Sequence, residues 1–229
     1  YVLFAQNYLM EEKIMNIQNN VIKAYLKNVF FVTGTACGGK STISRALAER
    51  HDLLLFNIDQ QFDQHQQLSD PAFQPAMNKT FRDADEFFGR SVEEYRKWLL
   101  ANTREQLDFV LLDLIQLSHD RPVVCDCHLT LEQASLFTDP ARVVFLLKEP
   151  FNVIEDYCNR PDHQGFNSFI NSTSDPEKAK ATCNETLRSL NEDFYRAVKH
   201  SEYFWVERTP DSTVQRTVEM VERHFGLLR

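Results

Sequence analysis

The residues with the clearest chemical purpose lie close together in the first fifth of the chain. Residues 34–41 read Gly-Thr-Ala-Cys-Gly-Gly-Lys-Ser and match the pattern G-x-x-x-x-G-K-[ST]. Glycines let the backbone bend so that successive N–H groups converge on phosphate oxygens. The lysine can bridge β- and γ-phosphates, and the serine hydroxyl can ligate Mg²⁺. The pattern predicts a nucleoside triphosphate site formed by Gly34, Thr35, Ala36, Cys37, Gly38, Gly39, Lys40, Ser41 and Thr42.

The elements that this loop needs are present on both sides of it. Residues 29–33 (VFFVT) form an apolar, β-branched and aromatic run, which predicts a buried strand. Residues 41–51 have apolar side chains at helical spacing, and a helix N-terminus favours bound anions. An incidental glycine-rich turn with a stray lysine is the alternative, and it would not require this strand and helix.

Strand and helix patterns alternate along the rest of the chain. This alternation predicts an α/β fold with three αβα layers and a five-stranded parallel sheet. Residues 60–120 contain helical patches and no strong strand, so we expect a helical insertion between the second and third strands, with a capping box at Ser91 and Glu94. Further strands are expected at 53–58, 122–127, 142–147 and 203–207, and helices at 11–27, 83–88, 91–101, 103–118, 131–137, 151–158, 176–199 and 212–225.

Residues 29 to about 225 resemble the nucleoside-monophosphate-kinase-like group of small-molecule kinases, which includes adenylate, cytidylate, shikimate and gluconate kinases. The resemblance rests on GTACGGKS, on Asp59 in NID, on Asp126 in VVCDC, on Arg160 in YCNRP and on a short fifth strand. It implies transfer of the γ-phosphoryl group of ATP, with Mg²⁺, to a small-molecule acceptor. The N-K-x-D motif of Ras-type GTPases is absent, because Asn78-Lys79 is followed by Thr80-Phe81.

The resemblance also implies roles for single residues. Asp59 would contact or deprotonate the acceptor, and Asp126 would hold Mg²⁺ together with Ser41. Arg160 would act from a polar, irregular lid at 159–175 on the transferring phosphoryl group. Three alternatives stay open: Asp59 as a turn or cap residue, Asp126 as an acceptor contact, and Arg160 as a solvated loop residue. Weaker candidates are His128 for the acceptor, Arg188, His163 and Lys178 for the lid, and the loop Arg208-Thr209-Pro210 for adenine.

Two features of the insertion have two interpretations each. Its arginines and aromatic rings suit a phosphorylated or ring-bearing acceptor, but they equally suit the core of an ordinary helical subdomain. The polar run 60–67 could line a sugar or base, or it could be a solvated loop. The residues concerned in the first pattern are Arg82, Arg90, Arg96, Arg104, Phe81, Phe87, Phe88, Tyr95 and Trp98.

Composition sets the outer limits of function. With 229 residues and a net charge of -8, the chain lacks the cationic excess of a nucleic-acid-coating protein. Its five cysteines fit no disulfide framework, Cys125-x-Cys127 lacks further zinc ligands, and no apolar stretch approaches a membrane span. We therefore expect a cytoplasmic enzyme, a monomer or homodimer, that uses neither nucleic acid nor membrane.

The chain divides by pattern into two parts. Residues 1–28 are expected to be an extension with a leading helix, and residues 29–229 a P-loop kinase domain. The identity of the acceptor is open, with a nucleoside or nucleotide slightly ahead of a sugar acid or another hydroxyl metabolite. Two other functions remain: a P-loop regulatory module that governs a partner, and a nucleotide-binding protein without catalysis.

Overall fold

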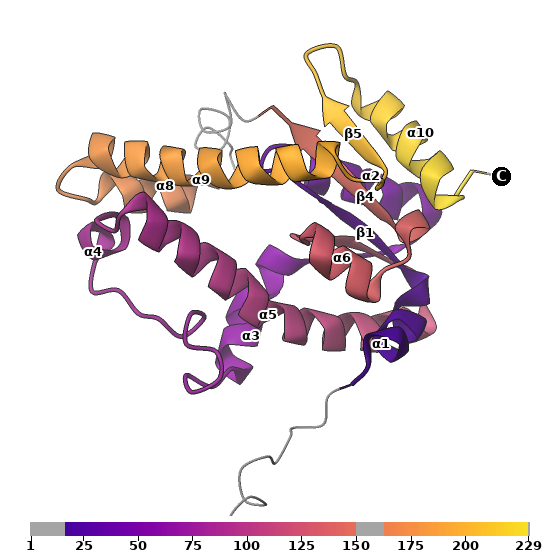
Figure 1. The fold of residues 1–229 in the computed structure, drawn as a ribbon, viewed down its shortest axis with the longest axis horizontal. Coiled ribbons are helices and arrows are strands. Elements are labelled where there is room, and N and C mark those ends of the chain that lie inside the picture. Colours follow the sequence, from indigo (N-terminus) through magenta and orange to yellow (C-terminus); the bar gives the residue numbers. More distant parts are fainter. Residues whose placement is uncertain (1–16, 150–162, 229) are drawn as a thin grey trace, which may run out of the picture.

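A parallel β-sheet forms the centre of the fold, in a computed structural model that describes residues 17–149 and 163–228. The five strands of the described chain are ordered β2-β3-β1-β4-β5. Figure 1 labels three of them, β1, β4 and β5. All five predicted strands are confirmed, with bounds shifted by one or two residues. They are β1 (Val29–Gly34), β2 (Leu54–Asn57), β3 (Val123–Asp126), β4 (Val143–Lys148) and β5 (Trp205–Arg208).

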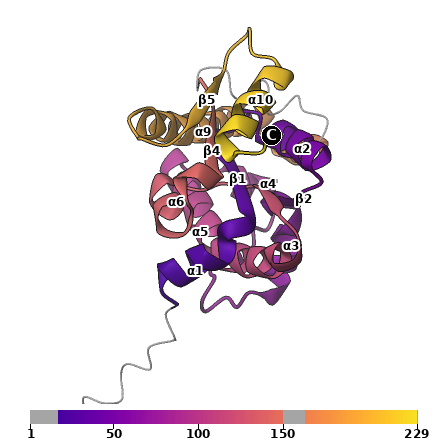
Figure 2. The same cartoon turned by 90° about the vertical axis from the view of Figure 1, so that its right-hand side faces the viewer.

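Helices cover both faces of this sheet, as the α/β prediction requires (Figure 2). Alternate residues of β1 enter opposite cores, because successive side chains of a strand point to opposite faces. Phe30 and Val32 pack with α2 (Lys40–His51) and α10 (Val214–Phe225). Val29 and Phe31 belong to the other core. That second core is covered by α1 (Asn19–Tyr25), α5 (Val92–Asp120), α6 (Leu131–Phe137) and α9 (Pro176–Lys199).

The region between β2 and β3 is helical, and its helices differ in detail from the predicted patches. A 3₁₀ turn (Ile58–Gln61) leads into α3 (Phe62–Leu68), so much of the polar run 60–67 is helix rather than loop. After α4 (Ala84–Phe88), the two patches expected at 91–101 and 103–118 form the single 29-residue α5. The predicted capping box is present: Glu94 N–H donates to Ser91, and Ser91 N–H donates to Glu94.

A third apolar cluster lies away from the sheet, at the left of Figure 1. It forms where α4, α8 (Gln164–Asn171) and the first halves of α5 and α9 meet. Phe88, Tyr95, Ile170 and Cys183 are buried in it. The Arg90 guanidinium carbon lies 4.2–4.6 Å from the ring centroids of Phe81, Phe87, Tyr95 and Trp98. The insertion's aromatic rings therefore form a subdomain core, which was one of their two predicted interpretations.

The described part of the expected lid is more regular than predicted. Gln164–Asn171 form the helix α8, where an irregular segment was expected. Phe166, Phe169 and Ile170 are spaced three and four residues apart, so one face of this helix is apolar and packs on the third cluster. The preceding residues 159–162, and the helix expected at 151–158, lie outside the described residues.

The N-terminal helix is shorter than predicted within the described range. It covers Asn19–Tyr25 and continues as a 3₁₀ turn (Leu26–Asn28) into β1. Leu26 is buried against the sheet, so this helix belongs to the core that it precedes. None of the described helices combines the length and apolar character that crossing a bilayer requires.

A buried polar relay attaches the insertion to the end of β2. His65 is 1% exposed, and its Nε2 lies 2.9 Å from the Asp113 carboxylate. Gln106 Nε2 donates to Ile58 O at 3.0 Å and lies 3.2 Å from His65 Nδ1. Because Gln106 donates, Nδ1 must accept, so His65 carries its proton on Nε2. The relay thereby fixes the backbone immediately before Asp59.

Replacing Gln106 should expose how strongly this relay stabilises the fold. Gln106→Leu leaves Ile58 O and His65 Nδ1 buried without their donor, at a cost of about 1–3 kcal/mol for each unsatisfied group. We expect urea unfolding to show a lower free energy of unfolding. Gln116→Leu, on an exposed position of the same helix, is the control and should change it little. Equal stability of both variants would contradict the relay.

Candidate functional site

The predicted phosphate loop is pressed against strand β4. A Cβ atom on Gly34 would lie 1.8 Å from Leu146 O, and one on Gly38 would lie 2.3 Å from the same oxygen. Both distances are far below van der Waals contact, so the loop adopts this path only because these two residues lack side chains. Cys37, between them, has φ 58, a left-handed conformation that side chains rarely adopt.

Three neighbouring elements hold the backbone of the loop. On the β4 side, Thr35 N–H donates to Leu146 O at 3.0 Å, and Lys148 N–H donates to Thr35 Oγ1 at 2.8 Å. From α9, Asn191 Oδ1 accepts from Ala36 N–H at 3.0 Å. From the end of β5, Arg208 Nη1 donates to Cys37 O at 3.1 Å. The curved backbone is thus fixed by the fold itself.

Helix α2 presents unsatisfied donors at the end of this loop. Its N-cap is Gly39, with no side-chain cap and no acidic residue in the first turn. The first N–H groups of a helix have no partner within it, and the helix dipole favours an anion there. Lys40 Nζ folds back and donates to Thr35 O at 3.0 Å and Gly34 O at 3.3 Å. Burial lowers the pKa of Lys40, and Asp126 and Asp59 oppose that shift.

Two carboxylates stand at the same end of the sheet and are linked by one amide. Asp126, at the end of β3, is 4% exposed and accepts from Asn57 Nδ2 at 2.9 Å. Asn57 Oδ1 in turn accepts from Asp59 N–H at 2.9 Å and from Gln60 N–H at 3.2 Å. Asn57 therefore orients both the buried carboxylate and the turn that carries the exposed Asp59.

His128 completes this group of polar side chains. Its Nε2 lies 3.9 Å from Asp59 Oδ1, and 44% of its side chain is exposed. The pKa of His128 is lowered from 6.5 to about 4 by burial, which disfavours the charged ring, and by repulsion from the positive charge of Lys40. The negative charge of Asp59 opposes this shift. Burial is the larger of the two causes, and repulsion from Lys40 is the second. At neutral pH the ring is uncharged and can accept a proton.

The predicted site residues divide into those that meet and those that do not. Lys40, Ser41 and Thr42 are the first residues of α2. Asp126 and Asp59 lie close enough to Lys40 for their negative charges to raise its pKa against the effect of burial. Arg160 lies outside the described residues. Arg208 contacts the loop itself through the Cys37 carbonyl. Arg188 lies on an exposed face of α9, where it forms ion pairs with Glu185 and Glu192.

The insertion's other arginines also serve mainly as surface or packing residues. Arg82 pairs with Glu86 on the surface, and Arg96 binds Ser189 and Asp193 of α9. Arg104 is exposed, as is Lys178 in the first turn of α9, and His163 precedes α8.

Sequence reasoning missed two residues of the site. Asn57 lies two positions before Asp59, and that spacing is typical of an Asn that caps a turn through its side chain. Asn191 shares an apolar stripe with Leu187, Phe194 and Val198, so a polar residue on a buried helix face was the available signal. Neither belongs to the G-x-x-x-x-G-K-[ST] pattern.

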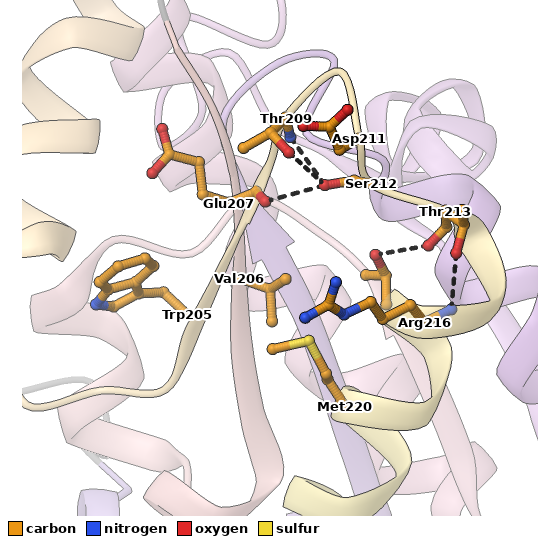
Figure 3. A pocket seen from close by; sticks show the side chains of 10 residues that line it. Trp205, Val206, Glu207, Thr209, Asp211, Ser212, Thr213, Arg216 and Met220 are labelled. Carbon is orange, nitrogen blue, oxygen red and sulfur yellow. Dashed lines mark hydrogen bonds between the residues drawn. The ribbon is translucent and has the colours of Figure 1, made fainter.

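A pocket lies elsewhere, between the sheet-edge strand β5 and helix α10 (Figure 3). Trp205, Val206, Arg216 and Met220 are among its lining residues, and Thr209 N–H donates to Ser212 Oγ at 2.9 Å. Of the predicted adenine loop only Thr209 lines it, and none of Lys40, Asp59 or Asp126 does. The polar end of the sheet, rather than this pocket, therefore carries the candidate chemistry.

Comparison with known proteins identifies no family. No family model matches the chain, and no curated protein matches it. Two solved structures are similar in shape, each with a TM-score of 0.43. One is a protein from Chloroflexus aurantiacus that is provisionally named a kinase. It is 14% identical to this chain, and the match covers 86% of this chain and 97% of that protein. The other is a dephospho-CoA kinase from Campylobacter jejuni. It is 15% identical to this chain, and the match covers 88% of this chain and 99% of that protein. Similarity at this level does not bear on function.

Substitution of Gly38 tests the close approach of the loop to β4. Gly38→Ala places a Cβ against Leu146 O, so the loop must move and its N–H groups no longer converge. We expect a lower melting temperature and weakened binding of ATP, measured by calorimetry. Gly165→Ala, where a Cβ meets nothing within 4 Å, is the control: it should not lower the melting temperature, because alanine favours helix α8, and it should leave ATP binding unchanged. A fully functional Gly38→Ala protein would refute this geometry.

Titration of His128 tests the electrostatics of the site. NMR of the imidazole should show a neutral ring between pH 5 and 6, with protonation only near pH 4. The unfolded chain binds this proton near pH 6.5 and the folded chain does not, so acidification from 6.5 towards 4 favours unfolding. Lys40→Met should raise the pKa of His128, whereas Lys97→Met, at an exposed position of α5, should not. An unchanged pKa in Lys40→Met would contradict the proposed repulsion.

Proposed function

We propose that this chain is an ATP-dependent phosphotransferase that transfers the γ-phosphoryl group to a small-molecule acceptor. One observation carries the proposal: a phosphate loop held against β4 by two obligatory glycines ends in the uncapped N-terminus of α2. Lys40 and the carboxylates Asp59 and Asp126 gather at that same end of the sheet. Ligands of open parallel sheets bind at the carboxyl ends of the strands.

The residues of the loop would bind and orient the triphosphate. The first N–H groups of α2 would donate to phosphate oxygens, and Lys40 would leave the carbonyls of Gly34 and Thr35 to bridge the β- and γ-phosphates. Arg208 would act mainly by holding the loop, because it donates to the backbone carbonyl of Cys37. Catalysis of this kind consists mostly of positioning and charge neutralisation.

The donor set also fits Mg²⁺. No group of three His, Cys, Asp or Glu side chains in the described chain could hold a metal alone. Mg²⁺ does not need one, because it is commonly bound through one or two carboxylates together with phosphates and water. Asp126, oriented by Asn57, and the Ser41 hydroxyl would hold the ion. When bound, it would neutralise charge on the β- and γ-phosphates.

The acceptor would approach from the side of Asp59. The Asp59 carboxylate is 77% exposed, and its turn is fixed by Asn57 and by the relay through Gln106. Asp59 and the neutral His128, 3.9 Å apart, are the two groups available to take a proton from an acceptor hydroxyl. We propose a nucleoside, nucleotide or other hydroxyl-bearing metabolite, with the first residues of the insertion lining its site.

Removal of the Lys40 ammonium tests the proposed reaction directly. Lys40→Met should reduce acceptor-dependent ADP release by roughly 10²–10³-fold, the effect of losing one positioned charge from a transition state. Lys97→Met serves as the control, because Lys97 lies on the surface of α5 and pairs only with Glu93 in the described chain. ADP release should be measured with a panel of nucleosides, nucleotides and sugar acids. Full activity of Lys40→Met would contradict the assignment.

The same panel distinguishes a kinase from a regulatory module. A kinase should release ADP faster when one class of acceptor is present. Tight ATP binding without stimulation by any acceptor would instead favour a protein that uses its nucleotide state to govern a partner.

A further inference from the structure

We infer that Asn57 is a positioning residue that ties the proposed metal site to the proposed acceptor site. Its one side-chain amide bonds the Asp126 carboxylate at one end and the backbone of the turn that carries Asp59 at the other. The two carboxylates are thereby held at a fixed separation, and so are the groups that they would bind. This inference rests on the proposed function, which gives the ion to Asp126 and the acceptor to Asp59.

The partners of the amide fix its orientation. Backbone N–H groups can only donate, so the atom that faces Asp59 N and Gln60 N, at 2.9 and 3.2 Å, must be Oδ1. Nδ2 is then directed at Asp126 Oδ2, 2.9 Å away, and a carboxylate oxygen accepts. A half-turn of the amide would place its two N–H groups against donors and its oxygen against the carboxylate. The amide of Asn57 therefore has one orientation, and both of its ends are held.

The sheet fixes the two residues that the amide joins. Asn57 is the last residue of β2 and Asp126 is the last residue of β3. The two strands are parallel, and these two residues are Cα partners in their ladder. Directly paired residues project their side chains from the same face of a sheet, so the amide lies beside the carboxylate. The backbone at each end of this bond belongs to the strand ladder rather than to a loop.

An amide can orient Asp126 without offsetting its negative charge. A lysine or arginine at position 57 would pair with the carboxylate and weaken its attraction for a cation. The amide N–H is a neutral donor, so the carboxylate keeps the charge that Mg²⁺ prefers in its ligands. The same group holds the turn of Asp59, whose carboxylate is 77% exposed and open to an acceptor. Misplacement of reacting groups by about 1 Å can cost about 10²-fold in rate, so a fixed separation has direct value for phosphoryl transfer.

The experiment measures how much Mg²⁺ tightens ATP binding, by calorimetry with and without the ion. Asn57→Ser keeps an oxygen that can accept from the N–H groups of the turn, but its side chain is too short to reach Asp126. We expect the dissociation constant for ATP to change less than twofold without Mg²⁺, and the tightening by Mg²⁺ to fall at least threefold. Asn78→Ser is the control, because it removes an amide that bonds only Ser69 and Gln74 in the described chain, and it should leave the tightening unchanged.

A second measurement tests the link to the acceptor turn. NMR of the wild-type protein, saturated with a non-hydrolysable ATP analogue, should show the Asn57 Nδ2 protons and the Asp59 N–H shifting together as Mg²⁺ is added. In Asn57→Ser, the Asp59 N–H should no longer respond to the ion, because the amide that joins the two sites is absent.

The possible outcomes separate the inference from the proposed function. Equal tightening by Mg²⁺ in Asn57→Ser and the wild type would overturn the inference, and so would an equal loss of affinity with and without the ion. If Asn57→Ser does not fold, the wild-type spectra decide: Asn57 Nδ2 protons that shift while the Asp59 N–H stays fixed would contradict the link. A wild-type chain that binds no ATP, or whose affinity is unaffected by Mg²⁺, would instead overturn the proposed function.

Discussion

The contact between the phosphate loop and strand β4 is the constraint on which the site depends. Leu146 O occupies the space where side chains at positions 34 and 38 would be, and Leu146 O also accepts from Thr35 N–H. The loop therefore lies directly on the buried strand β4. Asn191 from α9 and Arg208 from β5 then hold Ala36 and Cys37, two of the three residues between these glycines.

Two long helices, α5 and α9, connect the sheet to the third apolar cluster. The first halves of α5 and α9 pack with α4 and α8 in the third apolar cluster, while their second halves pack on the sheet. The same α9 that enters the cluster also carries Asn191, which accepts from Ala36 N–H. The described part of the expected lid belongs to this cluster through Phe166 and Ile170, and it is bonded to α4 through Ser174 and Asp85.

The fold was largely predictable from the sequence, and the site only in part. Short apolar runs predicted the buried strands, and the capping box at Ser91 predicted the start of α5. Both signals are local in the sequence, so they can be recognised without knowledge of the fold. The phosphate loop was predictable for the same reason, because its glycines, Lys40 and Ser41 all lie within residues 34–41. Asn191 and Gln106 were missed because they meet their partners across 155 and 48 positions of sequence. Likewise, only packing decides that rings such as Phe87 and Trp98 enclose Arg90 rather than a ligand.

A crystal structure with a non-hydrolysable β,γ-imido ATP analogue and Mg²⁺ tests the central claim most directly. The account predicts the β- and γ-phosphates inside the curve of the loop, bonded to the first N–H groups of α2 and to Lys40 Nζ. It also predicts Mg²⁺ beside Ser41 and Asp126. An analogue bound only in the pocket between β5 and α10, with the loop empty, would contradict the account.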